Sequence, residues 1–264
     1  MSSADFTTLI GSGPSGNRRF NPSYRRRPAA AARLEGPGSR LWGACKHVNY
    51  RIAQVLGRIV FFQTMNVEVV RPEAAERAGG YVLAPTHLSH LEPFCLGTLI
   101  RRKVDWMARF EFFRRWWTAA LLYALDSFPV NRTGVPVRAI RTAIARARAG
   151  RVVGIFPEGG VAVGAHSVCR GGPMKKGACF VAHRANVPIL PCVVLGTYNL
   201  NEVKPWLPFR NARIWVIYGR PIYPNVNADR RQAREELAAQ WKAQIRELYD
   251  ELRGIYNIPD SDVP

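Results

Sequence analysis

Short apolar runs alternate with segments of helical periodicity over residues 81–219, and this alternation limits the folds open to the chain. We predict strands at 81–86, 104–108, 127–130, 151–156, 188–196 and 212–219. We predict helices at about 93–102, 110–125, 135–149, 174–186 and 228–252, the last ending before Gly254. Strands that alternate with helices form mostly parallel sheets covered by those helices. The expected fold is therefore α/β, with a mostly parallel or mixed sheet flanked by helices on both faces.

The N-terminal region has a different pattern. Residues 1–39 are rich in Gly, Ser, Pro and Ala and have no sustained apolar period, so we expect a disordered basic tail. Apolar residues then recur at steps of four and three, which predicts an amphipathic helix over 40–63. Basic residues interrupt this helix, so we expect it to lie on a membrane surface rather than span the bilayer; packing on its own domain is the alternative. A domain over 64–256 and a C-terminal tail over 257–264 follow.

The charge of the chain indicates a polyanionic partner. The chain has 38 Lys and Arg against 19 Asp and Glu, a net charge of +19. Such a charge suits nucleic acid, an anionic membrane, or phosphorylated or CoA-like substrates. The five cysteines are scattered without a Cys-x-x-Cys pair, which argues against a disulfide framework or a zinc ribbon and fits a reducing cytoplasm. The first residues carry no basic segment followed by an apolar run, so we expect no signal peptide.

The stretch THLSHLEP, residues 86–93, sets polar side chains directly after the first of the predicted strands. A turn can fold Glu92 back onto His87, whereas a continuous helix would put them on diverging faces. A carboxylate beside an imidazole fixes its tautomer and stabilises the imidazolium, which makes the pair a general base for a hydroxyl group. The alternative is a capping box formed by Ser89 and Glu92. His87, His90 and Glu92 lack the further ligands and spacing of zinc sites, so we expect no metal.

Further polar groups lie near the ends of later strands or at the start of a helix. Arg132 ends SFPVNR, where a guanidinium suits a phosphate group and a solvated arginine is the alternative. Glu158, beside Gly159 in GIFPEGG, either hydrogen-bonds substrate hydroxyls or holds its turn in shape. Lys175 in GPMKKGA lies at a predicted helix start, which attracts anions. The sequence has neither a Walker loop nor a dinucleotide fingerprint, which disfavours nucleotide hydrolysis and Rossmann-type redox chemistry.

Taken in order, these motifs resemble the glycerophospholipid acyltransferase family, whose best-known members are the 1-acylglycerol-3-phosphate acyltransferases. That family is marked by H-x-x-x-x-D after a strand, an Arg that ends an F-P-V-x-R strand, F-P-E-G, and a V-P-I-x-P strand. The chain has His87 to Glu92, FPVNR, FPEG and VPILPC, with MKKGA between the last two. The resemblance covers about residues 60–220, and four ordered motifs are far more specific than any one of them.

The resemblance implies acyl transfer from acyl-CoA or acyl carrier protein to the hydroxyl of a lysophospholipid such as 1-acylglycerol-3-phosphate, without a cofactor. It implies that His87 is the general base and that Glu92 orients it. The chain departs from the family in having Glu92 where the family has Asp, and a shift of the turn must absorb the extra methylene.

The resemblance also implies that Arg132 and Lys175 hold the phosphate of the acceptor, and that Glu158 and Gly159 shape the acceptor site. The family often continues F-P-E-G with Thr-Arg, whereas this chain continues with Gly-Val. That change removes one phosphate contact, which Arg170 could replace from the following loop. An acceptor other than 1-acylglycerol-3-phosphate is therefore an alternative, such as an amino-acid lipid, a glycolipid or glycerol 3-phosphate.

A lysolipid acceptor lies in a bilayer, and RFEFFRRWWTAALLYAL, residues 109–125, combines aromatic and basic side chains that suit the headgroup region. Its apolar part is too short to span the bilayer. We expect a monotopic enzyme bound to the anionic surface of the cytoplasmic leaflet. A basic protein that binds membrane or nucleic acid without chemistry is the remaining alternative. Since the sequence has no recognisable nucleic-acid motif, we expect no specific nucleic-acid partner.

Overall fold

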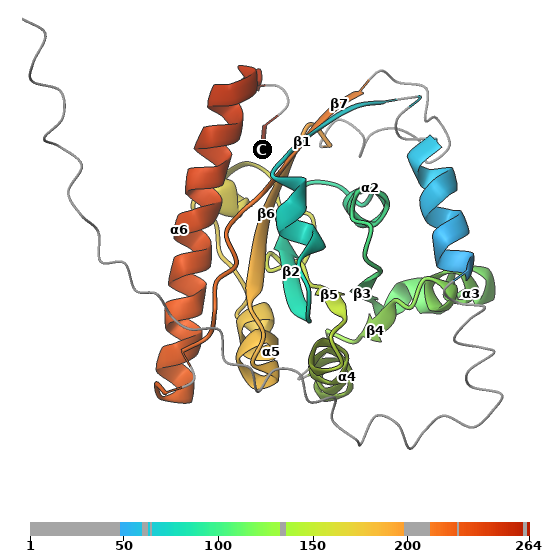
Figure 1. Cartoon of the computed structure of the whole chain (residues 1–264), viewed down its shortest axis with the longest axis vertical. Coiled ribbons are helices and arrows are strands. Elements are labelled where there is room, and N and C mark those ends of the chain that lie inside the picture. Colours follow the sequence, from blue (N-terminus) through green and yellow to red (C-terminus); the bar gives the residue numbers. More distant parts are fainter. Residues whose placement is uncertain are drawn as a thin grey trace, which may run out of the picture. The chain divides into compact units, whose positions relative to one another are not determined.

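The computed structural model describes residues 48–59, 63, 65–132, 136–197, 212–225, 227–260 and 263–264. The predicted tail over 1–39 and the first part of the predicted helix over 40–63 lie outside the described residues. Within the described part, strands and helices alternate along the chain around one sheet, as Figure 1 shows.

A seven-stranded mixed sheet forms the centre of the described part of the chain. Its strands are β1 (Met65–Val70), β2 (Tyr81–Pro85), β3 (Val104–Arg109), β4 (Phe128–Val130), β5 (Val152–Gly154), β6 (Ile189–Leu195) and β7 (Ala212–Tyr218). Their order across the sheet is β1-β7-β6-β2-β5-β3-β4, and neighbours pair in parallel except β6 with β7. The predicted α/β fold with a mostly parallel or mixed sheet is confirmed.

Strand β1 has no counterpart among the predicted strands. It pairs in parallel with β7, from Met65 opposite Ala212 to Val70 opposite Ile217. Its six residues follow closely on the predicted helix, and so short a run does not separate a strand from a helical stripe by its periodicity.

Helices cover both faces of the sheet, as predicted. The described helices are the helix over 48–59, α2 (Glu92–Leu99), α3 (Trp116–Ala124), α4 (Val137–Arg148), α5 (Gly177–Ala185) and α6 (Arg230–Tyr256). Short 3-10 turns accompany them: η3 (Pro72–Glu76), η4 (Phe110–Phe113), η5 (Gly164–His166) and η6 (Val168–Arg170). Successive strand residues point to opposite faces. In β2, Val82 and Ala84 join a core with α4, α5 and α6, whereas Tyr81 and Leu83 join a second core with α2.

The last helix is longer than predicted, because α6 continues past Gly254. A glycine inside a helix costs only about 1 kcal/mol relative to alanine, which packing can offset, and the nearby Leu252 is buried. Asn257, with a φ of 47°, ends the helix in the left-handed conformation. The prediction that the helix ends before Gly254 is therefore wrong. Beyond it, Ile258 and Val263 of the predicted C-terminal tail are buried against the core.

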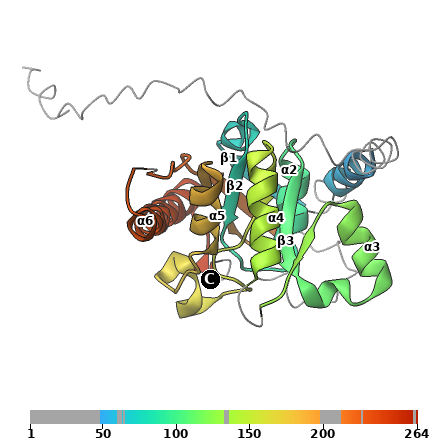
Figure 2. The same ribbon diagram turned by 90° about the horizontal axis from the view of Figure 1, so that it is seen from below.

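The helix over 48–59 lies near α3, on the side of the sheet farthest from α6 (Figures 1 and 2). Neither η4 nor α3 contains a buried side chain. In the helix over 48–59, only Tyr50 and Gln54 are buried among the described residues. We refer to the helix over 48–59 together with η4 and α3 as the outer wall.

The helix over 48–59 attaches to α2 through polar side chains. The Nε2 of Gln54 donates to the carbonyl oxygens of Gly97 (2.9 Å) and Ile100 (2.8 Å), and the Nε of Arg58 donates to that of Thr98 (2.7 Å). The last carbonyls of a helix lack intrahelical partners, so these bonds satisfy the C-terminal end of α2.

The apolar stripe of the same helix is left exposed. Its side chains are 49 to 56% accessible: Val48, Ile52, Val55 and Ile59. The helix thus packs on its own domain, the alternative considered from the sequence, but does so with its polar side. That the stripe faces a membrane stays a prediction. Among the described helices, none is long and apolar enough to cross a bilayer.

Candidate active site

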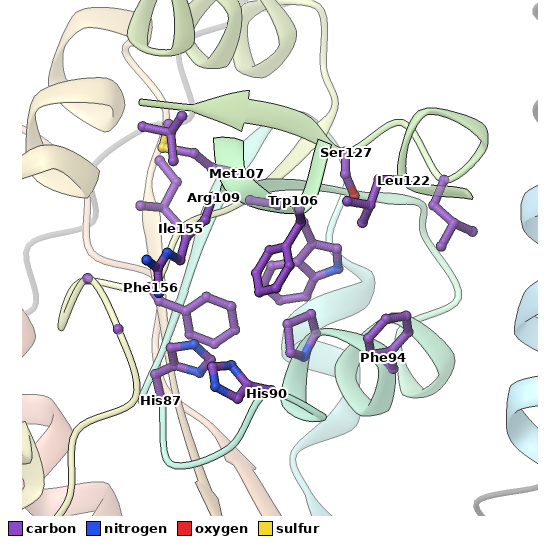
Figure 3. A pocket seen from close by; sticks show the side chains of 18 of the residues that line it. His87, His90, Phe94, Trp106, Met107, Arg109, Leu122, Ser127, Ile155 and Phe156 are labelled. Atoms are coloured by element: carbon purple, nitrogen blue, oxygen red, sulfur yellow. The ribbon is translucent and has the colours of Figure 1, made fainter. Parts of the chain in front are cut away.

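A cavity of about 850 Å³ has the outer wall on one side and α2 and β3 on the other. Its lining is mostly apolar, and it reaches the edge at which the parallel strands β2, β3 and β5 end (Figure 3). Functional groups of α/β proteins gather at this edge. Basic and imidazole side chains line the cavity there: His87, His90, Arg109, Arg132 and Lys175.

The structure brings His87 and Glu92 together across the turn between β2 and α2. His87 follows the end of β2, and α2 begins at Glu92 with Pro93 in its first turn. The Nδ1 of His87 lies 2.8 Å from the Oε2 of Glu92. His87 lines the cavity, and Glu92 is fully buried. Because Nδ1 is engaged by the carboxylate, Nε2 is the ring nitrogen that can accept a proton.

The second oxygen of the Glu92 carboxylate is surrounded by donors. Its Oε1 accepts hydrogen bonds from the N–H groups of Leu88 (2.8 Å) and Ser89 (3.2 Å) and from the hydroxyl of Thr197 (2.8 Å). The bond from Ser89 is one half of the capping box considered from the sequence. The hydroxyl of Ser89 accepts from the N–H of Leu91 at 3.2 Å. Glu92 therefore caps the turn with one oxygen and holds His87 with the other.

Burial and hydrogen bonding act in opposite directions on this pair. Burial lowers the pKa of His87, and the charge of Arg132 lowers it further. Burial raises the pKa of Glu92 more than the hydrogen bonds from Leu88, Thr197 and Ser89 lower it. The three donors that converge on Oε1 nonetheless favour a carboxylate, and they leave that oxygen no acceptor for a carboxyl proton. The contacts therefore fit an ionised Glu92 and a neutral His87 that carries its proton on Nδ1.

An aromatic stack fixes the plane of the His87 ring. The ring of Phe156 lies against it with centroids 3.9 Å apart and planes inclined by 23°, as Figure 3 shows. Trp106 stacks on the far side of Phe156 at 5.1 Å. The space for Trp106 depends on Gly154, where a Cβ would lie 2.3 Å from the indole ring. The imidazole is thus held by Glu92 at its edge and by Phe156 on its face.

Glu158 is tied to backbone on two sides. Its Oε2 accepts from the N–H of His87, and its Oε1 accepts from the N–H of Val168 (2.8 Å) and the hydroxyl of Ser167 (3.3 Å). Burial raises the pKa of Glu158 to about 7. Gly159 is among the described residues that line the cavity and Glu158 is not. Of the two roles considered from the sequence, these contacts favour holding the turn in shape.

Lys175 lies beside Gly159 and Arg132 lies beside Gly160, the two glycines that follow Glu158. At Gly159, where φ is 76°, a Cβ would lie 2.7 Å from the Nζ of Lys175. At Gly160 a Cβ would lie 3.7 Å from a guanidinium nitrogen of Arg132. A side chain at either glycine would therefore take up space beside one of the two cations. The predicted phosphate-binding pair thus lines the same cavity as His87.

Two residues of this region were not predicted as site residues. Arg109, at the end of β3, lines the cavity, and its charge, after burial, lowers the pKa of Arg132. In the sequence it was assigned only to the aromatic and basic segment. Thr197 follows β6, a strand parallel to β2, and lies in no motif. Both follow strands that end at the same edge of the sheet, which is the signal that could have found them.

Two other polar residues have different surroundings from those considered in the sequence. The Nε of Arg170 donates to the carbonyl oxygen of Pro264, and Arg170 is not among the described residues that line the cavity. Its suggested role as a replacement phosphate contact is therefore not supported. His90 lines the cavity with its ring centroid 6.2 Å from that of His87. In the part of the chain that the structure describes, no group of three or more His, Cys, Asp or Glu could hold a metal ion.

Known proteins share this sequence pattern and fold. A family model described as Acyltransferase matches residues 66–195. The 1-acyl-sn-glycerol-3-phosphate acyltransferase of Bacillus subtilis (strain 168) is 27% identical over 190 residues, which cover 70% of this chain and 89% of the relative. The crystal structure of the 1-acyl-sn-glycerophosphate acyltransferase PlsC from Thermotoga maritima has a TM-score of 0.57 at 18% identity, covering 83% of this chain and 86% of that one.

Proposed function

Because the chain belongs to the glycerophospholipid acyltransferase family and is an O-acyltransferase of the 1-acylglycerol-3-phosphate type, we propose that it moves a fatty acyl group from an acyl thioester to the hydroxyl of a lysophospholipid. The donor is acyl-CoA or acyl carrier protein, and the acceptor is 1-acylglycerol-3-phosphate or a close analogue. The observation that carries the proposal is the 2.8 Å contact between His87 Nδ1 and Glu92 Oε2 beside an apolar cavity.

His87 is the general base of the proposed reaction. Its Nε2 takes the proton of the acceptor hydroxyl, whose oxygen attacks the carbonyl carbon of the thioester. The carbon–sulfur bond then breaks, and the imidazolium returns the proton to the leaving thiolate. The ionised Glu92 stabilises the imidazolium while it exists and keeps Nε2 aimed at the acceptor. Base catalysis of this kind contributes about 10²- to 10⁴-fold to the rate.

The acceptor phosphate binds among the cations at the strand ends. Arg132, Lys175 and Arg109 line the cavity beside His87, and guanidinium groups bind phosphate oxygens through paired hydrogen bonds. Arg109 and Arg132 repel one another, since the charge of Arg109 lowers the pKa of Arg132. A bound dianion relieves that repulsion, which supports a phosphorylated acceptor over a neutral one.

The apolar part of the cavity holds the acyl chain. It is lined by side chains such as Phe94, Leu121, Leu122 and Leu125 together with Trp106. A volume of about 850 Å³ lies in the upper part of the range of small-molecule sites, which bury most of the surface of their ligands. The cavity therefore has room for a hydrocarbon chain that starts at His87.

The outer wall binds the anionic surface of the cytoplasmic leaflet, as a monotopic enzyme does. Its exposed apolar side chains include Ile52, Val55 and Trp116, the last 83% accessible. Arg114 and Arg115, which precede α3, are exposed beside them. Apolar side chains that enter a headgroup region flanked by arginines fit an interfacial helix. This placement brings a bilayer-bound acceptor next to the cavity.

A transfer assay on the purified protein tests the proposed function. Labelled acyl-CoA and acyl carrier protein are offered with a panel of lysophospholipids, glycerol 3-phosphate, an amino-acid lipid and a glycolipid in anionic liposomes. We expect labelled phosphatidic acid from the wild type and at least a 10²-fold lower rate from His87→Ala. His183→Ala changes a histidine on α5 that does not line this cavity among the described residues, and serves as the matched control. Transfer to none of these acceptors, or full activity of His87→Ala, would overturn the proposal.

A further inference from the structure

The turn after β6 delivers Thr197 to the buried side of the catalytic pair. Gly196 has a φ of 82°, and a Cβ at this position would lie 2.0 Å from the carbonyl oxygen of Arg213. Only glycine adopts this conformation in so little space without strain. The next residue, Thr197, is fully buried, and its hydroxyl donates to Glu92 Oε1 at 2.8 Å, across a separation of 105 residues.

From this geometry we infer that Thr197 is a positioning residue of the site, whose hydroxyl keeps Glu92 ionised and aimed at His87. The inference rests on the proposed function, since it assigns a task to the proposed base. Thr197 does not line the cavity among the described residues, so it acts through Glu92 and not on the substrate.

Glu92 needs such a hydrogen-bond donor because it is completely buried. A buried carboxylate without partners takes up a proton, and a protonated Glu92 could not stabilise an imidazolium. The backbone N–H groups of Leu88 and Ser89 hold Oε1 from one side, and Thr197 adds a donor from the end of β6. Because the turn and the strand end belong to different elements, Oε1 is fixed from two directions and Oε2 stays directed at His87.

A second buried threonine at the same edge supplies a control. The Oγ1 of Thr86 accepts a hydrogen bond from the N–H of Val194 at 3.1 Å. Both threonines are fully buried. Thr86→Val therefore removes a buried hydroxyl that contacts backbone, whereas Thr197→Val removes one that contacts the carboxylate.

The pH profile of kcat/KM distinguishes positioning from a merely structural role. Without the hydroxyl of Thr197, the ionised form of Glu92 loses a hydrogen-bond donor. The pair of His87 and Glu92 therefore keeps its proton up to a higher pH. In Thr197→Val we expect a rate at neutral pH lower by about 10- to 100-fold, the usual effect of a lost hydrogen bond to a charged group. The acid-side midpoint should also rise, by up to about one pH unit for each tenfold destabilisation of the ionised carboxylate. Thr197→Ser should restore both, and Thr86→Val should keep the wild-type midpoint.

Thermal unfolding checks that each variant is folded. If Thr197→Val does not fold, Thr197→Cys keeps the volume with a weaker donor and should move the midpoint in the same direction. Carbon-13 NMR of the wild-type protein, with Glu92→Gln to identify the Glu92 signal, measures its ionisation directly, and we expect a carboxylate at pH 7. A folded Thr197→Val or Thr197→Cys with the wild-type midpoint, or a protonated Glu92 at pH 7, overturns the inference. If His87→Ala is inactive while Thr197→Val keeps the wild-type profile, this inference fails and the proposed function stands.

Discussion

The two sides of the cavity differ in how much of their surface they bury. Every residue of β2 and β5 is buried, and three of the six residues of β3 are. We call these strands together with α2 the inner wall, of which only α2 and β3 line the cavity among the described residues. On the outer wall, α3 buries none of its side chains, and the helix over 48–59 leaves its apolar stripe exposed. A buried wall can hold an imidazole in one orientation, whereas an exposed wall can meet a lipid surface. We therefore expect the chemistry on the first side and substrate delivery on the second.

The largest effect should come from removing the charge on the inner wall. Glu92→Gln keeps the size of the side chain but cannot stabilise an imidazolium, so we expect kcat to fall by roughly 10²- to 10⁴-fold. Glu92→Asp keeps the charge and shortens the reach to His87 and Thr197, so its loss should be smaller. Rates of labelled acyl transfer measure both. If Glu92→Gln keeps more than a tenth of the wild-type rate, the charge on the inner wall has no special role in catalysis.

A smaller effect is expected at the cations where the two walls meet. Arg132→Ala removes a charged hydrogen-bond donor, so kcat/KM for a phosphorylated acceptor should fall by about 10- to 100-fold. The rate with a monoacylglycerol, which has no phosphate, should change little. Arg141→Ala, at an exposed position of α4, is the matched control. Equal losses with both acceptors would show that Arg132 supports the fold rather than the phosphate.

On the outer wall the expected effect concerns binding and not chemistry. Ile52→Ser and Trp116→Ser replace exposed apolar side chains, and each should weaken binding to anionic liposomes by about 10- to 100-fold, given about 1.5 to 3 kcal/mol for burying such a group. Ile255→Ser, equally exposed on α6, should have no effect. Co-sedimentation at low salt measures the binding. If Ile255→Ser weakens binding as much as Ile52→Ser does, the outer wall has no special part in membrane contact.

The smallest expected effect is that of the charge of Arg132 on the titration of His87. The charge of Arg132 lowers the pKa of His87, after burial. Its removal in Arg132→Ala should raise that pKa, so the neutral base is reached only at higher pH. The acid-side midpoint of kcat/KM, which reports the free enzyme, should then rise by a fraction of a pH unit, and Arg132→Lys should restore it. Because salt screens such interactions, a shift that persists unchanged at high ionic strength would contradict this cause.

The inner wall was more predictable from the sequence than the outer wall. The contact between His87 and Glu92 depends on one turn between a strand and a helix, and local spacing carries that information. Thr197 could not be assigned in the same way, because its contact with Glu92 spans 105 residues and depends on which strands are neighbours. Arg109 was seen as part of a charged segment, since the end of β3 becomes informative only once its place in the sheet is known.

For the outer wall, periodicity revealed the apolar stripe of the helix over 48–59 but not the direction it faces. The expected choice was between a membrane and the domain itself, with the stripe as the contact surface. The structure attaches the helix through Gln54 and Arg58 to the end of α2. A helix face that docks through polar side chains is hard to recognise in a sequence, because a solvent-exposed polar face has the same residue pattern.

This mode of attachment makes the outer wall sensitive to its solvent. The hydrogen bonds from Gln54 and Arg58 to the carbonyls of α2 are buried or partly buried, and where water still reaches such a bond its net contribution is only about 0.5 to 1.5 kcal/mol. Where water is excluded, the same bonds become much stronger. We therefore expect the attachment of the helix over 48–59 to be stronger on a lipid surface that excludes water from the outer wall than in solution. The cavity would be most firmly enclosed when the protein rests on lipid, at the moment when an acyl chain needs to be held.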